Sequence, residues 1–205
     1  MNYATPGVDI FLFGQIKYMP IPEILKYFGI LSYPLFSVVA LLLTSGKNNY
    51  SLHTQTISKS ILHLDKKIDR LIFRSNFLVK MFLDLGFYYY MVSQLHFGNI
   101  SLISFTLTLS ALSFGLMAYF VEGIRYKKIH LFLAYGGGIF WTLGIVFLSM
   151  KMGDNNFVIY STATAIVALA IAFGFLFAKK TNVHVQTLIY IIMYVWTIIF
   201  TLKFL

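Results

Sequence analysis

The sequence predicts an all-α fold, a polytopic transmembrane bundle of six helices preceded by an N-terminal interfacial segment. Six apolar stretches each reach the roughly 20 residues that cross the ~30 Å hydrocarbon layer of a membrane. Only 11% of the 205 residues are charged, whereas soluble proteins carry about 25%. Aromatic residues make up 18% of the chain, which is typical where rings pack against lipid and lie at its interfaces.

Most connections between the apolar stretches are too short to hold a soluble domain. The predicted spans are Ile24–Thr44, Leu71–Tyr90, Ile100–Val121, His130–Met150, Phe157–Ala178 and Val183–Lys203. We therefore divide the chain into an N-terminal segment, residues 1–23, and a six-helix transmembrane domain, residues 24–205.

The N-terminal segment is too short to span a membrane. Val8–Tyr18 is apolar but interrupted by Asp9, Gln15 and Lys17, and two prolines follow it. This pattern predicts an interfacial helix, with a re-entrant segment as the alternative.

Basic residues lie mostly on one side of the predicted bundle. The odd-numbered connections hold Lys47, Lys59, Lys66, Lys67, Arg70, Arg125, Lys127, Lys128, Lys179 and Lys180, and the other side holds Lys17, Lys26, Lys151 and Lys203. Because Lys and Arg concentrate in cytoplasmic loops, we expect a protein of the cytoplasmic membrane with its odd-numbered loops in the cytoplasm and both termini outside. The formal net charge of +9 is explained in this way, and we predict no nucleic-acid binding.

The first connection, residues 45–70, is the only long one. In its second half, Ile61, Leu62, Leu64 and Ile68 form a stripe at helical spacing. This predicts an amphipathic helix on the membrane surface. Its basic residues would bind anionic lipid headgroups. These residues are Lys59, Lys66, Lys67 and Arg70.

Small residues indicate where helices approach closely in lipid. Ala170, Gly174 and Ala178 lie at four-residue spacing in the fifth span, and we expect this stripe to pack against a neighbour. The triplet Gly136–Gly138 in the fourth span predicts close packing or a local helix break.

The second span carries the strongest candidate site. Asn76, Lys80, Asp84 and Tyr88 follow one another at i, i+4 spacing and form one polar stripe. A charge at the centre of a membrane helix costs about 2.5–3.5 kcal/mol on insertion scales, so the stripe should face the bundle interior. It predicts either a lining for a polar cavity or ion path, or a self-satisfied pair that fixes helix register together with Ser and Thr hydroxyls of the third span.

Histidines form a second candidate site on the predicted cytoplasmic face. His53, His130 and His184 would share a site with Glu122 if the helix ends converge there. Such a site would suit a membrane-embedded lipid hydrolase or transferase. No two histidines have the three- or four-residue spacing of metal ligands, and the chain has no cysteine. We therefore predict no metal and no cofactor, and single histidines at helix ends are also explained as interfacial polar residues.

Several landmarks are similar in type and order to those of one membrane-protein family. They are Asn49, Ser51 and His53 in the first loop, Phe73 and Asn76 in the second span, His130 with Ala134 and Gly138 in the fourth, and Tyr190, Tyr194 and Trp196 in the last. The chain resembles the six-helix prokaryotic family of unknown function related to the eukaryotic Frag-type and DRAM-type (damage-regulated autophagy modulator) proteins. The resemblance implies a six-helix bundle and a role in handling lipid or glycolipid. The Leu-Gly that follows the loop serine in that family is replaced here by Lys59-Ser60.

Together these patterns favour a lipid-engaging integral membrane protein with a polar intramembrane cavity rather than an enzyme. Its partners would be anionic membrane lipids. Two alternatives remain open: a small structural subunit, with a membrane-protein partner or as a homo-oligomer, and the histidine-based lipid hydrolase or transferase.

Overall fold

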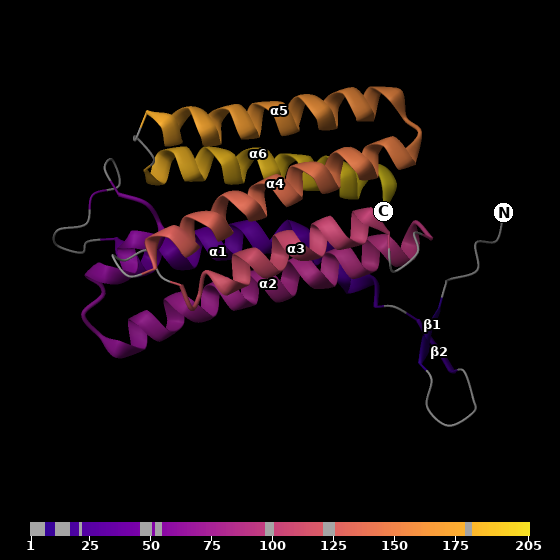
Figure 1. The fold of residues 1–205 in the computed structure, drawn as a ribbon. Coiled ribbons are helices and arrows are strands. Elements are labelled where there is room, and N and C mark those ends of the chain that lie inside the picture. Colours follow the sequence, from indigo (N-terminus) through magenta and orange to yellow (C-terminus); the bar gives the residue numbers. More distant parts are fainter. Residues whose placement is uncertain are drawn as a thin grey trace.

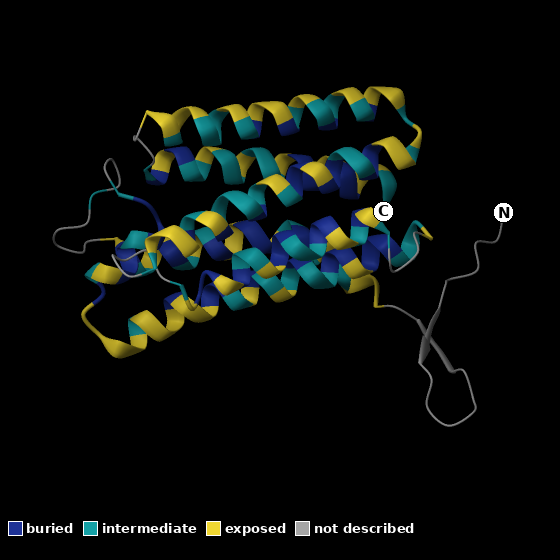
Figure 2. Ribbon diagram, in the orientation of Figure 1, coloured by how far each residue is buried: buried dark blue, intermediate teal, exposed yellow. Residues whose placement is uncertain are grey.

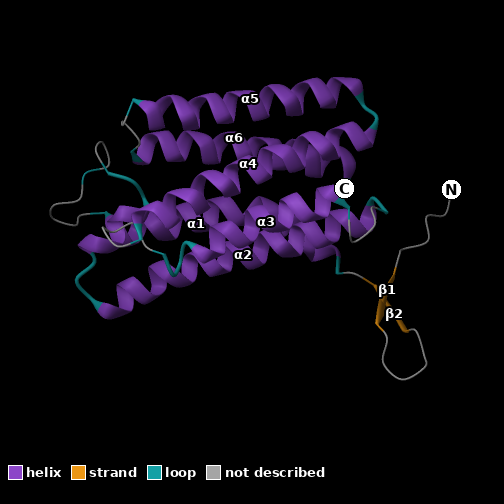
Figure 3. Ribbon diagram, viewed as in Figure 1, coloured by secondary structure: helices purple, strands orange, loops and turns teal. Residues whose placement is uncertain are grey.

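The computed structural model describes residues 7–10, 17–20, 22–45, 51, 55–96, 101–120, 126–178 and 182–205, with only the backbone for 7–10 and 17–20. Six α-helices form within this part of the chain (Figures 1 and 3). They are α1 (Phe28–Thr44), α2 (Lys67–Gln94), α3 (Leu102–Leu116), α4 (Lys127–Met152), α5 (Asn155–Phe177) and α6 (Val183–Phe204). A 3₁₀ helix, Glu23–Tyr27, leads into α1, and another, Ser58–His63, precedes α2.

The prediction of a helical bundle is confirmed. Four described helical stretches are long and apolar enough to cross a membrane: Glu23–Thr44, α4, α5 and α6. Helix α3 is apolar but shorter, and α2 is less apolar because Lys80 and Asp84 lie within it. Large apolar side chains such as Phe132, Ile159 and Phe177 are exposed. Exposed positions recur along all six helices (Figure 2). Apolar surface of this extent is typical of a membrane protein.

The helices form a ring. Each helix packs against the next one in sequence, and α6 packs against α1 to close the ring (Figure 1). Consecutive helices run antiparallel, so the bundle has two distinct ends. The connections α1–α2, α3–α4 and α5–α6 lie at one end, called here the odd-loop end. The connections α2–α3 and α4–α5 lie at the other, the even-loop end, where α1 also begins and α6 ends.

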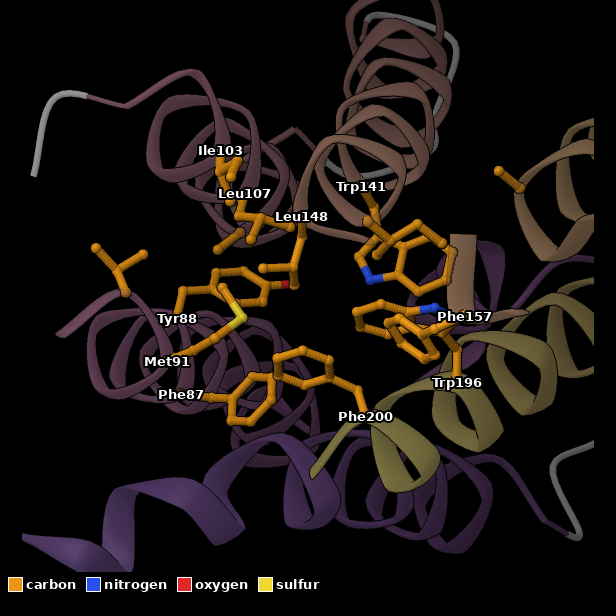
Figure 4. Packing of buried hydrophobic residues seen from close by; sticks show 14 residues of the cluster. Phe87, Tyr88, Met91, Ile103, Leu107, Trp141, Leu148, Phe157, Trp196 and Phe200 are labelled. Atoms are coloured by element: carbon orange, nitrogen blue, oxygen red, sulfur yellow. The ribbon is translucent and has the colours of Figure 1, made fainter. Parts of the chain in front are cut away.

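A separate apolar cluster fills each end of the ring. Figure 4 shows the cluster at the even-loop end, where rings from α2, α4, α5 and α6 converge. Trp141 meets Trp196 edge to face with ring centroids 5.8 Å apart, and Trp196 stacks on Phe200 at 5.2 Å. The Trp196 Nε1 group donates to Ser161 Oγ at 2.9 Å and so ties α6 to α5. The cluster at the odd-loop end is built around Phe36, Phe73, Phe77 and Leu64.

Glycines allow close approaches between helices. Not all of these glycines are the ones that the sequence analysis singled out. A Cβ on Gly144 of α4 would lie 2.5 Å from Leu107 Cδ2 of α3, so any other residue there would force the Leu107 side chain to move. Helix α4 continues through Gly136–Gly138, so of the two features predicted there the helix break is absent. The close packing is present at Gly137, where a Cβ would lie 3.2 Å from Ser113 Cβ of α3.

The stripe of Ala170, Gly174 and Ala178 in α5 is exposed, so its predicted packing is wrong. The buried face of α5 instead carries Ser161, Ala165 and Ala168. Because small residues occur on both faces of this helix, their spacing alone does not identify the packed one.

The N-terminal segment differs from the expected interfacial helix. Gly7–Ile10 (β1) pairs with Lys17–Pro20 (β2) as an antiparallel hairpin in which Val8 lies opposite Met19. Its apolar residues alternate with polar ones, as in Val8-Asp9-Ile10, which suits a strand better than a helix.

The first connection is not the single amphipathic helix that the sequence predicts. The 3₁₀ helix ends at His63, and α2 begins only at Lys67. Ile61 and Leu64 are buried in the cluster at the odd-loop end, whereas Leu62 and Ile68 are exposed. The four residues therefore share no single face, because the segment folds onto the end of the bundle instead of continuing into α2.

One ion pair at the even-loop end leads to a prediction about acid stability. Asp154, the N-cap of α5, accepts a hydrogen bond from Phe157 N at 3.0 Å, and Lys203 Nζ donates to its other oxygen at 2.6 Å. The hydrogen bond from Lys203, followed by that from the Phe157 amide, holds the pKa of Asp154 below its ordinary value. A lowered pKa stabilises the folded state above the ordinary Asp pKa of about 3.9, and this contribution is lost as pH falls through the folded-state value.

We expect Asp154→Asn to flatten the decline in melting temperature between about pH 5 and pH 2.5, a window that brackets the ordinary Asp pKa. Lys203→Gln removes the same pair from its other side and should give a similar profile. If the melting temperature of both variants fell with pH as steeply as that of the wild type, the contact would contribute nothing to stability.

Candidate functional site

The polar stripe of α2 lies inside the bundle. Asn76, Lys80, Asp84 and Tyr88 are all buried, and Lys80 is only 2% exposed. The sequence suggests the hydroxyls of the third span as partners for this stripe. The structure instead places Ser32 of α1 against the two charges.

Lys80, Asp84 and Ser32 form a closed triangle of hydrogen bonds. Lys80 Nζ donates to Asp84 Oδ2 at 2.7 Å and to Ser32 Oγ at 3.0 Å. Ser32 Oγ in turn donates to Asp84 Oδ1 at 2.5 Å. Each carboxylate oxygen therefore accepts a hydrogen bond, which offsets much of the cost of burying the charge.

Two aromatic rings complete the surroundings of the ammonium group. Lys80 Nζ lies 3.7 Å from the ring centroid of Tyr33 and 4.8 Å from that of Phe114. Ring faces attract cations, and the attraction is stronger where water is excluded. The charge on α2 thus contacts side chains of both α1 and α3, the two helices beside it in the ring.

The two remaining residues of the stripe have other surroundings. Asn76 Nδ2 donates to the Phe36 carbonyl at 2.8 Å and so binds α2 to α1. Tyr88 packs into the apolar cluster at the even-loop end (Figure 4). Of the four predicted residues, Lys80 and Asp84 line the main cavity.

That cavity has a volume of about 430 Å³ and lies between the helices on the side of α4, α5 and α6. It extends from Lys80 and Trp141, at mid-bundle, to Lys59 and Lys127 at the odd-loop end. The volume falls within the 300–1,000 Å³ range of small-molecule sites. The cluster around Trp141, Trp196 and Phe200 fills the space beyond it toward the even-loop end.

The cavity wall is mostly apolar or aromatic. Small residues of α4 and α5, including Ala134, Gly138, Ala168 and Ala172, leave the space that larger side chains would fill. Tyr135 of α4 stacks on Phe173 of α5 with centroids 5.9 Å apart, forming part of the wall between these helices. Polar groups such as Lys80, Asp84 and His130 also line it, so the wall suits an amphipathic ligand.

The histidines predicted to share a site are only partly described. His130 is buried and lines the cavity, and its Nδ1 donates to the Phe120 carbonyl at 2.6 Å, which places the proton on that nitrogen. His184 is exposed and is not part of the cavity wall. His53 and Glu122 lie outside the described residues. Across the ranges that are described, no three His, Cys, Asp or Glu residues form a group that could hold a metal.

The basic residues expected to bind headgroups from one helical face are separated. Lys59 lines the cavity, while Lys66 and Lys67 are exposed beyond it. Arg70 donates from Nε to the Leu64 carbonyl at 2.7 Å and from Nη2 to the Asp65 carbonyl at 3.2 Å, so it holds the turn before α2.

Sequence reasoning missed Ser32 and Tyr33 as residues of this site. Ser32 and Tyr33 lie in an otherwise apolar span, and their side chains turn inward to the charges of α2. A signal was available in Pro34, since a proline inside a membrane helix often accompanies polar residues that compensate for its missing amide.

Comparison of the chain with protein-family models, with curated proteins and with solved structures finds no match. The resemblance to the Frag-type and DRAM-type proteins therefore stays a prediction.

We expect the buried pair to behave as a unit when it is mutated. Lys80→Met leaves the Asp84 carboxylate without its cation and should lower the free energy of unfolding by about 3–5 kcal/mol. Lys80→Met/Asp84→Leu should recover most of this loss, because no unpaired charge remains and Ser32 can bond back to its own helix. Denaturation in mixed detergent micelles measures the free energy of unfolding of both variants. A double variant as unstable as Lys80→Met would contradict the pairing.

Proposed function

We propose that this protein is a six-span integral membrane protein that binds a lipid in the cavity between α4, α5 and α6. The observation that carries this proposal is the cavity itself, about 430 Å³ in volume, with mostly apolar walls and a base formed by a buried ion pair. A resident ligand with a long apolar part would match these walls.

The six-span count rests on α2 and α3 in addition to the four longer apolar stretches. Helix α2 has 28 residues, and its central charges are paired inside the bundle. A paired, inward-facing charge is tolerated in a membrane helix, so α2 can cross beside its neighbours. Helix α3 has 15 residues and continues through hydrogen-bonded turns to Phe120, which lengthens its apolar stretch. With six spans, the excess of Lys and Arg in the odd-numbered loops favours a cytoplasmic location for the odd-loop end.

The cavity is more consistent with a lipid-binding site than with a water-filled ion path. Lys80 and Asp84 are the charged groups at mid-bundle, and each already has protein partners. Their charges cancel locally, and the rings of Tyr33 and Phe114 cover the ammonium group. The family resemblance also favours lipid handling.

No covalent chemistry is part of the proposal. Among the described histidines only His130 lines the cavity, so a histidine-based hydrolase or transferase gains no specific support.

Two glycines of α4 provide a matched test of the bound lipid. A Cβ would meet no atom within 4 Å at Gly138, which lines the cavity, or at Gly136, which does not. Gly138→Leu should therefore fill the cavity without disturbing the fold and lower lipid retention about tenfold, since forcing methylenes into occupied space typically costs 1–3 kcal/mol. Gly136→Leu should retain lipid at the wild-type level.

Native mass spectrometry of protein released gently from its own membrane measures the retained lipid. Both variants should fold, because leucine is the better helix former. Equal lipid retention in the two variants would disprove the cavity as the binding site. A stoichiometric protein partner in place of lipid would favour the structural-subunit alternative.

A further inference from the structure

We propose that the ligand is an uncharged lipid whose headgroup carries carbonyl oxygens, and that this headgroup binds at mid-bundle to the hydroxyls of Tyr33, Ser110 and Tyr190. Quinones and acylglycerols are membrane lipids of this chemistry. The inference rests on the proposed function and adds the headgroup chemistry and the orientation of the ligand. The apolar part of the lipid would extend from mid-bundle toward the odd-loop end.

Three hydroxyl groups from three helices lie in the cavity wall without a hydrogen-bond partner. They belong to Tyr33 of α1, Ser110 of α3 and Tyr190 of α6. None of the three takes part in a side-chain hydrogen bond within the part of the chain that the structure describes. By contrast, Thr142 Oγ1 of the same wall donates to the Ile139 carbonyl at 2.8 Å. A hydroxyl that is removed from water without a new partner is costly, so these three groups need an explanation.

The hydroxyls of Tyr33 and Ser110 open to the cavity. The two residues are only 5% and 8% exposed, so protein encloses almost all of each side chain. Among the described residues that are not exposed, Gln55 Oε1 is the one fully enclosed side-chain oxygen or nitrogen that lacks a partner. The hydroxyl oxygens of Tyr33 and Ser110 therefore keep a small open surface, and the cavity is the space that both residues border. An atom of a bound ligand can reach them there.

Aromatic packing holds Tyr190 beside the same group of residues. Its ring meets those of Phe36 and Phe114 edge to face, with centroids 5.9 Å and 6.1 Å apart. The ring of Tyr33 lies 6.3 Å from it, and all three distances are typical of interacting aromatic rings. Because these rings are already packed, a headgroup that bonds to the hydroxyls of Tyr33 and Tyr190 loses little free energy to side-chain ordering.

The charges at mid-bundle favour an uncharged headgroup. Lys80 and Asp84 line the cavity there as an ion pair, with Nζ 2.7 Å from Oδ2. An anionic headgroup would compete with Asp84 for its cation, and a cationic headgroup would compete with Lys80 for its carboxylate. Either competition would leave a buried charge without its partner, which is strongly unfavourable. A carbonyl oxygen accepts a hydrogen bond from a phenol or serine hydroxyl and leaves the pair intact.

The rest of the wall suits the apolar part of such a lipid. Small residues of α4 and α5 line it from mid-bundle toward the odd-loop end, namely Gly138, Ala134, Ala168 and Ala172. Ligand sites commonly combine apolar walls with a few placed polar groups that fix the orientation of the ligand. The three hydroxyls are such groups, and their place at mid-bundle directs the headgroup inward.

The test uses purified, delipidated full-length protein in detergent, incubated with an equimolar mixture of decylubiquinone, dioctanoylglycerol and decyl phosphate. Native mass spectrometry gives the amount of each probe that the protein retains. We expect an uncharged probe to be retained in preference to decyl phosphate. Whether it is decylubiquinone or dioctanoylglycerol identifies the source of the carbonyl oxygens as a quinone or an acylglycerol.

Variants that remove one hydroxyl each assign the headgroup to its site. Tyr33→Phe, Tyr190→Phe and Ser110→Ala should each lower retention of the uncharged probe, relative to decyl phosphate, about fivefold, the usual effect of one hydrogen bond. Tyr194→Phe is the matched control, because Tyr194 lies on α6, is partly buried like Tyr190 and is not part of the wall. It should retain the probes as the wild type does.

The melting temperature of the ligand-free variants separates ligand binding from a structural role. Tyr33→Phe and Tyr190→Phe should melt at or above the wild-type temperature, because the hydroxyl that each loses has no partner in the protein. A lower melting temperature in both, with unchanged probe retention, would assign the hydroxyls to the fold and overturn the inference.

The remaining outcomes distinguish this inference from the proposed function. Preferred retention of decyl phosphate, or equal probe retention in the wild type and the three hydroxyl variants, would overturn the uncharged headgroup and its site. The lipid cavity would still stand if Gly138→Leu lost its native lipid in the same preparations. Equal retention of native lipid in Gly138→Leu and Gly136→Leu would overturn both proposals.

Discussion

The Lys80–Asp84 pair constrains the whole arrangement of helices. A membrane helix that carries two charges near its centre must bury them, and buried charges need partners within hydrogen-bond distance. Ser32 of α1 provides such a partner, and the rings of Tyr33 and Phe114 provide the remaining contacts. These contacts fix the rotation of α2 against both neighbours. The apolar packing of the helix ends follows from that rotation, since Phe77 and Phe87 then point inward at opposite ends.

The two ends of the bundle are filled in different ways, and this difference positions the cavity. At the even-loop end, large rings from α4, α5 and α6 meet directly. The ring centroids of Phe157 and Phe204, for example, lie 4.8 Å apart. At the odd-loop end, α4 and α5 present small residues, and the apolar cluster there is built mainly from α1, α2 and the first connection. Space therefore remains on the α4–α6 side of that end. Helix packing in lipid lacks a strong hydrophobic drive to close such a space.

Much of the fold follows from local pattern, whereas the site depends on contacts between distant residues. Apolar length predicts the helices within a few residues, as for the span from Val183, because backbone hydrogen bonds must be satisfied within each helix in lipid. The spacing of Lys80 and Asp84 predicts their burial for the same energetic reason. Ser32 could not be assigned as their partner, since nothing near it in sequence indicates which helix α2 will contact. The contact between Ile57 and Gln186 joins residues 129 positions apart, so no local periodicity reveals that the first connection docks on α6.

That docking changes the meaning of the basic residues in the first connection. As a continuous amphipathic helix, the segment would present Lys59, Lys66 and Lys67 together to a membrane surface. The break after His63 instead turns Lys59 inward while leaving Lys66 and Lys67 outside. Burial of Ile61 and Leu64 drives this break, because both are removed from lipid and water only when the segment folds back onto the bundle. The same apolar contacts that close the odd-loop end thus place Lys59 in the cavity wall.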